Sequence, residues 1–207
     1  MLSTFPTLLP FLLFAFVASI TPGPTNILVL DNSARYGLKH TLPMIVGACA
    51  SAASIVWLVG CGFGELLSRT PYLQTAMQWL GVAWLSYLAW KVFRAPPLRL
   101  ETRHTAPIGG AGVWTAISLQ WVNPKTWMMA LSVIGVFVDN SGARADQVWH
   151  LSAVFFLVAL PCLFMWAVLG AGSRRLITSN NAQQRFNQIM GLLLLFTAWM
   201  GSGVIRL

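Results

Sequence analysis

Six long apolar stretches dominate the sequence and limit the folds open to it. They run over residues 5–30, 41–63, 73–90, 113–138, 148–171 and 189–205. A helix that crosses a bilayer needs roughly 20 apolar residues, within a range of about 17 to 25, and each stretch reaches that range. The runs are continuous, whereas membrane-spanning strands alternate between apolar and polar residues. We therefore predict an all-α integral membrane protein with six transmembrane helices.

The composition excludes an ordinary soluble domain. Hydrophobic side chains make up 57% of the 207 residues and charged side chains only 9%, against about 25% in soluble domains. The connections between the stretches are too short for a second folded domain, so we predict a single transmembrane domain over residues 1–207. Nothing basic precedes the first stretch, as it would in a secretory signal, and we expect this stretch to be retained as a helix.

The placement of the basic residues predicts an orientation. Those in the connections after the first, third and fifth stretches are Arg35, Lys39, Lys91, Arg94, Arg99, Arg103, Arg174, Arg175 and Arg185. The opposite side holds Arg69, Arg144 and Arg206. Short cytoplasmic loops are enriched in Lys and Arg, so we expect both termini on the periplasmic side of the membrane. This topology accounts for the net charge of +8 without a nucleic-acid partner.

The residue types that usually carry catalysis or bind metals show no recognisable pattern. The three cysteines lie within apolar stretches without C-x-x-C spacing, and the three histidines fall in or beside different loops. We therefore predict no catalytic site, no metal site and no cofactor. A membrane thiol-redox enzyme and a non-transporting helper subunit of a membrane complex remain as alternatives to a transporter.

Two of the apolar stretches are interrupted by proline and polar residues. Residues 21–26 read Thr-Pro-Gly-Pro-Thr-Asn, and residues 120–126 read Gln-Trp-Val-Asn-Pro-Lys-Thr. Proline removes a backbone donor and leaves carbonyl groups that hydrocarbon cannot satisfy. Thr or Asn ahead of proline is typical of a helix N-cap, so we predict caps at Thr21 and Asn123. Each break lies about ten residues, or roughly 15 Å, from the cytoplasmic edge, which places it near the membrane centre.

The number of stretches on either side of the central loop predicts an internal repeat. Three stretches precede residues 94–112, a predicted cytoplasmic loop, and three follow. Residues 1–93 and 113–207 would therefore cross the membrane in opposite orientations. Secondary transporters use this arrangement, in which broken helices from two inverted halves meet at a central substrate site.

Lys125, beside the second break, points to the chemistry of that site. A cation at the bilayer centre costs at least about 2.5 to 3.5 kcal/mol and usually faces a cavity or a partner. Together with two half-helix N-termini it favours a carboxylate, while the freed carbonyls favour an ammonium group, so a zwitterionic amino acid matches both. The predicted binding residues are Thr21, Pro22, Gly23, Pro24, Asn26, Gln120, Asn123, Pro124 and Lys125. The alternative is that Lys125 only binds the freed carbonyls and stabilises the break.

Asp31 is the carboxylate closest to the proposed pathway and the candidate for proton coupling. Two alternatives stay open: Asp31 pairs with Arg35 at i+4, or Lys125 carries the coupling proton. The small-residue spacing from Gly60 to Gly64 permits a homo-oligomer but does not require one.

These motifs resemble the LysE/RhtB family of amino-acid exporters. The resemblance rests on the Thr-Pro-Gly-Pro-x-Asn segment at 21–26, on Gly37 and Gly47, and on Asn-Pro-Lys at 123–125, and it covers nearly the whole chain. Residues 81–91 and 119–123 are most similar to the EamB-type cysteine and O-acetylserine exporters. The resemblance implies export of small neutral amino acids from the cytoplasm across a bacterial inner membrane, driven by the proton gradient.

Overall fold

The computed structural model describes residues 5–96, 112–138, 144–176 and 179–201, and every regular element within them is a helix. The helices are α1 (Phe5–Ile20), α2 (Pro24–Tyr36), α3 (Leu38–Leu58), the π-helical turn η2 (Val59–Phe63), α4 (Gly64–Arg69), α5 (Pro71–Phe93), α6 (Val113–Val122), α7 (Pro124–Phe137), α8 (Arg144–Leu176) and α9 (Asn180–Gly201). Arg99, Arg103, Arg206 and most of the predicted loop 94–112 lie outside the described residues.

Two pairs of consecutive helices meet at the predicted breaks. Residues 21–23 separate α1 from α2, and the helix axis bends there by 56°. Asn123 alone separates α6 from α7. Both second helices begin with proline, as predicted, since proline at the first helical position loses only a donor that has no partner there. By contrast, Pro43 and Pro161 lie inside the continuous helices α3 and α8.

Among the described residues, two helices are long and apolar enough to cross a membrane by themselves. They cover Leu38–Leu66 and Arg144–Ser173, and the bent pair α1–α2 makes a third if it is counted as one span. Helix α7 is apolar but has only 14 residues. The six-span topology therefore stays a prediction, while the all-helical fold and the apolar spans are present.

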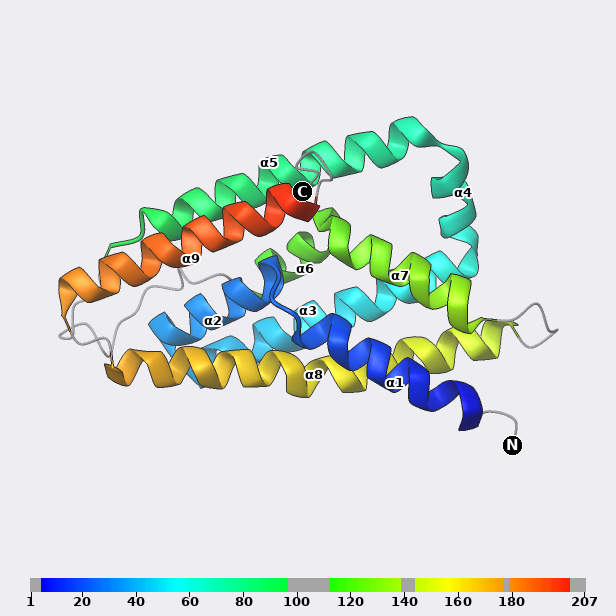
Figure 1. Ribbon diagram of the computed structural model, residues 1–207, viewed down its shortest axis with the longest axis horizontal. Coiled ribbons are helices and arrows are strands. Elements are labelled where there is room, and N and C mark those ends of the chain that lie inside the picture. Colours follow the sequence, from blue (N-terminus) through cyan, green and yellow to red (C-terminus); the bar gives the residue numbers. More distant parts are fainter. Residues whose placement is uncertain (1–4, 97–111, 139–143, 177–178, 202–207) are drawn as a thin grey trace.

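Helix α8 runs along α1, α2 and α3, and α5 pairs with α9 on the opposite side of the molecule (Figure 1). Helices α6 and α7 lie against α3, between these two groups. The buried side chains form one continuous apolar core, whose largest members include Phe11, Met44, Ile55 and Leu119. This packing places the two breaks side by side in the interior.

Glycine permits the closest helix contacts. A Cβ atom at Gly81 of α5 would lie 2.0 Å from the Val122 carbonyl oxygen, at the second break. A Cβ atom at Gly170 of α8 would lie 2.2 Å from the Leu30 carbonyl oxygen of α2. Gly60 packs against Val148 within the same chain, so this part of the Gly60–Gly64 pair is already used in intramolecular packing.

Candidate functional site

The two helix breaks face each other across a pocket in the interior. Its polar lining comes from Ser19, Gly23, Pro24, Thr25, Asn26, Gln120, Asn123, Lys125 and Thr126. The apolar lining comes from Ala18, Cys49, Ala52, Met129, Phe155, Ala159 and Leu163. The volume open to water-sized molecules inside the pocket is about 40 Å³, which is well below the roughly 300 to 1,000 Å³ of pockets that enclose drug-sized ligands. The pocket thus has a polar half built by the breaks and an apolar half built by α3, α7 and α8.

Lys125 connects the second break to the first. Its ammonium nitrogen Nζ donates to the Thr21 carbonyl oxygen at 2.9 Å, and the side chain is half-buried. A Cβ atom at Gly23 would lie 3.2 Å from that nitrogen, so the absence of a side chain at Gly23 leaves room for the Lys125 side chain. An ammonium group has three donors, and this bond uses one of them. The geometry matches the alternative in which Lys125 stabilises the break, and it also leaves donors free for a ligand.

Three carbonyl groups at the first break accept hydrogen bonds from side chains. The Ser19 carbonyl oxygen accepts from Asn26 Nδ2 at 2.8 Å, and the Ile20 carbonyl oxygen accepts from Trp166 Nε1 at 3.1 Å. Together with the bond from Lys125, these contacts satisfy three successive carbonyls with donors from α2, α8 and α7. A backbone carbonyl without a hydrogen-bond partner raises the free energy of a membrane-embedded fold. These three side chains therefore stabilise the end of α1 at this point.

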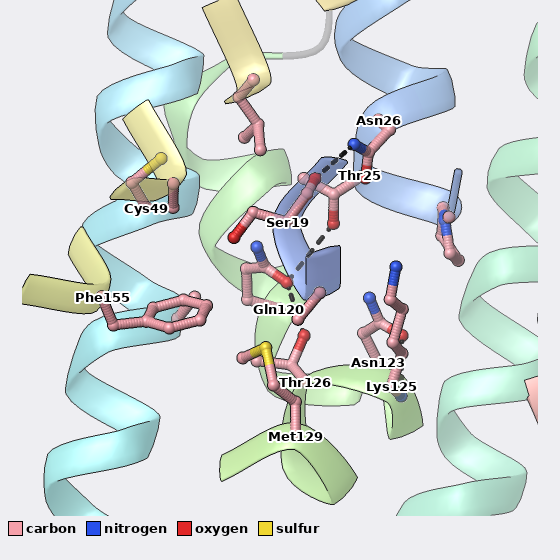
Figure 2. A pocket seen from close by; sticks show the side chains of 16 residues that line it. Ser19, Thr25, Asn26, Cys49, Gln120, Asn123, Lys125, Thr126, Met129 and Phe155 are labelled. Atoms are coloured by element: carbon pink, nitrogen blue, oxygen red, sulfur yellow. Dashed lines mark hydrogen bonds between the residues drawn. The ribbon is translucent and has the colours of Figure 1, made fainter. Parts of the chain in front are cut away.

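Gln120 joins four helices at the centre of the site (Figure 2). Its Oε1 atom accepts from Thr126 Oγ1 at 2.7 Å and from Thr25 Oγ1 at 3.3 Å. Its Nε2 atom donates to the Ala48 carbonyl oxygen of α3 at 3.3 Å. Because Gln120 lies on α6, these bonds tie α2, α3 and α7 to one buried side chain.

The two predicted N-caps have different outcomes. Asn123 caps α7 as predicted, because its Oδ1 atom accepts from the Lys125 backbone N–H at 3.1 Å. The prediction for Thr21 is wrong, since α2 is capped by Gly23 without a side-chain hydrogen bond. The Thr21 hydroxyl donates instead to the Val17 carbonyl oxygen, one turn back in α1. Two extra residues separate Thr21 from the start of α2, and this distance prevents capping.

The structure brings most, though not all, of the predicted binding residues to the pocket. Gly23, Pro24, Asn26, Gln120, Asn123 and Lys125 line it. Thr21, Pro22 and Pro124 are not among the lining residues; Thr21 contributes only the carbonyl bonded to Lys125. Their roles as binding residues stay predictions.

Asp31 lies about two turns beyond the first break, away from the pocket lining. Its carboxylate accepts from Arg35 Nε at 2.8 and 3.0 Å, and the side chains of the pair are only 7% and 10% exposed. This i+4 ion pair is the alternative to proton coupling that the spacing indicated. Nearby, Asn32 Nδ2 donates to Thr41 Oγ1 at 3.0 Å, and Ser33 Oγ donates to the Ala167 carbonyl oxygen at 2.7 Å.

Several residues that line the pocket are not among the binding residues predicted from the sequence. Thr126 belongs to the second break and Thr25 to the first, so the motifs themselves contained these two hydroxyls. Cys49 lies in the small-residue run of the second apolar stretch. Phe155 and Met129 carry no local signal, because only packing brings α7 and α8 to the pocket. Ser19 precedes the motif and has no sequence signal either.

Comparison with known proteins gives the family. The family model described as "LysE type translocator" matches residues 16–200. The chain belongs to the LysE type translocator family. The match includes both breaks and every residue that lines the pocket, and together with the apolar helices it makes this translocator a multi-pass membrane protein.

Curated relatives cover nearly the whole translocator. A cysteine/O-acetylserine efflux protein of Klebsiella pneumoniae subsp. pneumoniae is 28% identical over 198 residues, which is 93% of this chain and 96% of the relative. A cysteine/O-acetylserine efflux protein of Salmonella choleraesuis is 27% identical over 195 residues, covering 91% and 96%. An uncharacterised membrane protein of Vibrio cholerae is 28% identical over 200 residues, covering 95% and 94%. No solved structure matches the chain.

Proposed function

We propose that this translocator is a secondary active exporter of small neutral amino acids and derivatives, such as cysteine or O-acetylserine, and that it is not an enzyme. The observation that carries the proposal is the meeting of two broken helices, with the Lys125 ammonium group between them, at an interior pocket. Membership of a translocator family and the printed names of the relatives support amino-acid export. Transport runs from the cytoplasm across the bacterial inner membrane.

The polar half of the pocket binds the amino and carboxylate groups in this proposal. The donors on Lys125 that are not bonded to Thr21 face a carboxylate, and the N-terminal ends of α2 and α7 add positive dipole ends. The side-chain amides of Asn26, Gln120 and Asn123 lie 3% to 6% exposed around this position. A small substrate fits better than a large one, because four helices converge on Gln120 and narrow the site.

The packing partners support two inverted halves, residues 1–93 and 113–207, that rock about the site. The bent pair α1–α2 packs on α8, and its counterpart α6–α7 packs on α3, the second helix of the other half. Helices α5 and α9, the last of each half, pack on each other. Exchanging the halves leaves these three pairings unchanged, as expected for an inverted repeat in a secondary transporter.

Export in this proposal exchanges the substrate for protons, and Asp31 is the coupling candidate. Its buried pairing with Arg35 gives the carboxylate a partner that protonation would release. We expect Asp31→Asn to retain exchange of labelled for unlabelled substrate but to lose accumulation driven by a pH gradient. Full gradient-driven accumulation by Asp31→Asn would remove Asp31 from the coupling step and leave Lys125 as the alternative.

The predicted orientation, with both termini on the periplasmic side, places the basic connections after α2, α5 and α8 in the cytoplasm. Single cysteines introduced at Lys39 and at Glu65 in a cysteine-free background should react with an impermeant thiol reagent from opposite sides. Labelling of both positions from the same side would contradict this topology.

Transport into inverted vesicles tests the proposed function. Labelled cysteine, O-acetylserine and a panel of neutral amino acids should enter vesicles that contain the protein, and uptake should depend on the pH gradient. Lys125→Ala should abolish uptake, whereas Lys39→Ala, at an exposed position outside the pocket, should not. No uptake of any amino acid by the wild-type protein would contradict the proposal.

The same system tests the two alternatives. Unchanged transport after replacement of Cys49, Cys61 and Cys162, all free thiols in the structure, would dismiss a thiol-redox enzyme. Transport by the purified chain alone in liposomes would dismiss a helper subunit.

A further inference from the structure

Ser19 differs from most helical serines of this protein. Its residue surface is 7% exposed, and its hydroxyl oxygen is buried without a hydrogen-bond partner among the described residues. Serines in helices commonly donate to a carbonyl oxygen three or four residues back. Ser54, Ser118, Ser132, Ser152 and Ser173 all do so here. Ser19 leaves this local bond unmade, although buried polar groups without partners are rare.

The position of Ser19 indicates why its hydroxyl is free. Ser19 lies in the last turn of α1 and lines the pocket, and Figure 2 shows its side chain projecting on the Cys49 and Phe155 side, away from Lys125 and Asn123. Its backbone carbonyl is bonded to Asn26, which fixes the residue, while the hydroxyl turns about the Cα–Cβ bond. The residue is therefore held in place with one adjustable polar atom beside the pocket.

Several other polar groups that line the pocket are already engaged. Gln120 Oε1 accepts from both Thr25 and Thr126, and Asn26 Nδ2 donates to the Ser19 carbonyl. The wall beyond Ser19 is apolar and consists of Cys49, Ala52, Phe155, Ala159 and Leu163. A ligand whose charged groups sit at Lys125 extends its side chain along this wall, with the Ser19 hydroxyl at the boundary.

We propose that the Ser19 hydroxyl binds the side-chain oxygen or sulfur atom of the transported amino acid, and so selects substrates that carry one uncharged heteroatom. This inference rests on the proposed export function and specifies its substrate class. A hydroxyl both donates and accepts, so it suits a thiol, an alcohol or an ester oxygen. A purely aliphatic side chain would leave the buried hydroxyl unpaired, which a site built for a hydrogen bond disfavours.

Three nearly isosteric amino acids test the inference. Cysteine, serine and 2-aminobutyrate differ only in a thiol, a hydroxyl or a methyl group at one position. In liposomes containing the purified wild-type protein, cysteine and serine should compete with the labelled substrate about tenfold better than 2-aminobutyrate does. Ser19→Ala should reduce this preference to about onefold, mainly by raising KM for cysteine and serine.

Ser86→Ala is the matched control. The Ser86 hydroxyl is also buried without a partner, but Ser86 is not among the pocket-lining residues, so its removal should leave the preference unchanged. Ser19→Cys keeps a small polar atom and should retain part of the preference, which provides a second variant if Ser19→Ala does not fold.

The outcomes separate this inference from the proposed function. No transport of any amino acid by the wild type would overturn both. Transport with equal competition by cysteine, serine and 2-aminobutyrate in the wild type would overturn the role of Ser19 alone, whatever the variants do. An unchanged preference in Ser19→Ala, or an equal loss for all three amino acids, would do the same and leave amino-acid export standing.

Discussion

The two helix breaks look alike in sequence, yet they are held together in different ways. At the first break, between α1 and α2, three carbonyl groups take donors from Asn26, Lys125 and Trp166, and two of these donors come from the other half of the chain. At the second break, between α6 and α7, the side-chain bonds to backbone groups are local, although the Gln120 side chain also bonds to Thr25 and Ala48 of the first half. Asn123 caps α7 by accepting from the Lys125 backbone N–H, and Trp127 Nε1 donates to the Trp121 carbonyl oxygen at 2.7 Å.

The two breaks therefore differ in what satisfies their backbone groups. The bonds of Asn123 and Trp127 at the second break persist as long as residues 120–127 keep their conformation. The first break keeps two of its three only while the two halves hold their present relation. If the two halves rock as we propose, the Ile20 and Thr21 carbonyl groups lose their present donors, whereas the local bonds of Asn123 and Trp127 are kept.

Removal of the Lys125 ammonium group should have the largest effect. In Lys125→Ala we expect transport to fall about 100-fold, because the Thr21 carbonyl loses a hydrogen bond from a charged donor, which is worth about 1.5 to 3 kcal/mol. Hydrogen exchange should rise over residues 19–27 and stay unchanged over 120–127, as mass spectrometry of peptides can measure. Equal exchange changes at both breaks would contradict the distinction between them. Lys125→Arg serves as the control that keeps the charge.

The second break should be sensitive to its close contact with α5, a helix of the first half. Gly81→Ala places a Cβ atom against the Val122 carbonyl oxygen, and such overpacking costs about 1 to 3 kcal/mol of unfolding free energy. Thermal unfolding in detergent measures the loss. Gly135→Ala, with nothing within 4 Å of the added Cβ atom, is the matched control in α7. If the Gly81→Ala protein is as stable as Gly135→Ala, close packing of α5 against the Val122 carbonyl does not limit stability.

Loss of the side-chain cap on α7 should have a smaller effect. We expect Asn123→Ala to lower the unfolding free energy by about 1 kcal/mol, because one backbone N–H loses its acceptor. Asn123→Asp keeps an acceptor oxygen and should lose less. If denaturant unfolding shows the same loss for both variants, the amide nitrogen rather than the cap is what matters at this position.

The smallest effect is expected at Thr21. Its hydroxyl bonds within α1 and caps nothing, and only its backbone carbonyl contacts Lys125. Thr21→Val should therefore change the unfolding free energy by less than about 1 kcal/mol and leave KM for cysteine unchanged. A severalfold rise in KM would show that the Thr21 side chain takes part in binding. The first break would then resemble the second in using a motif side chain.

Local signals predict the all-helical fold, but they predict some helix ends poorly. Helix α9 begins nine residues before its apolar stretch, and α2 ends six residues after its own. Pro24 and Pro124 open α2 and α7 as the motifs indicate. Asn123 directly precedes its proline and therefore caps. Thr21 fails as a cap because the spacing in Thr-Pro-Gly-Pro places Gly23, not Thr21, next to the helix.

The pocket is predicted only in part. Six of the nine expected binding residues line it, because the break motifs are where helices end and polar groups gather. Ser19, Met129 and Phe155 are missed, since each lies in a regular helix with no local irregularity. The ion pair of Asp31 with Arg35 follows from i+4 spacing, but no spacing predicts that it is buried.

The sequence by itself determined that this chain is an apolar, all-helical membrane protein and that α2 and α7 begin at prolines. These properties depend on hydrophobicity, proline geometry and capping, which act over a few residues. Tertiary structure decided which donors satisfy the first break and which side chains face the pocket. The deciding contacts join residues 95 to 146 positions apart, such as Thr25 with Gln120, Thr21 with Lys125 and Ile20 with Trp166. Only the packing of the two halves creates them, because each buried carbonyl accepts whichever donor the neighbouring helix brings within reach.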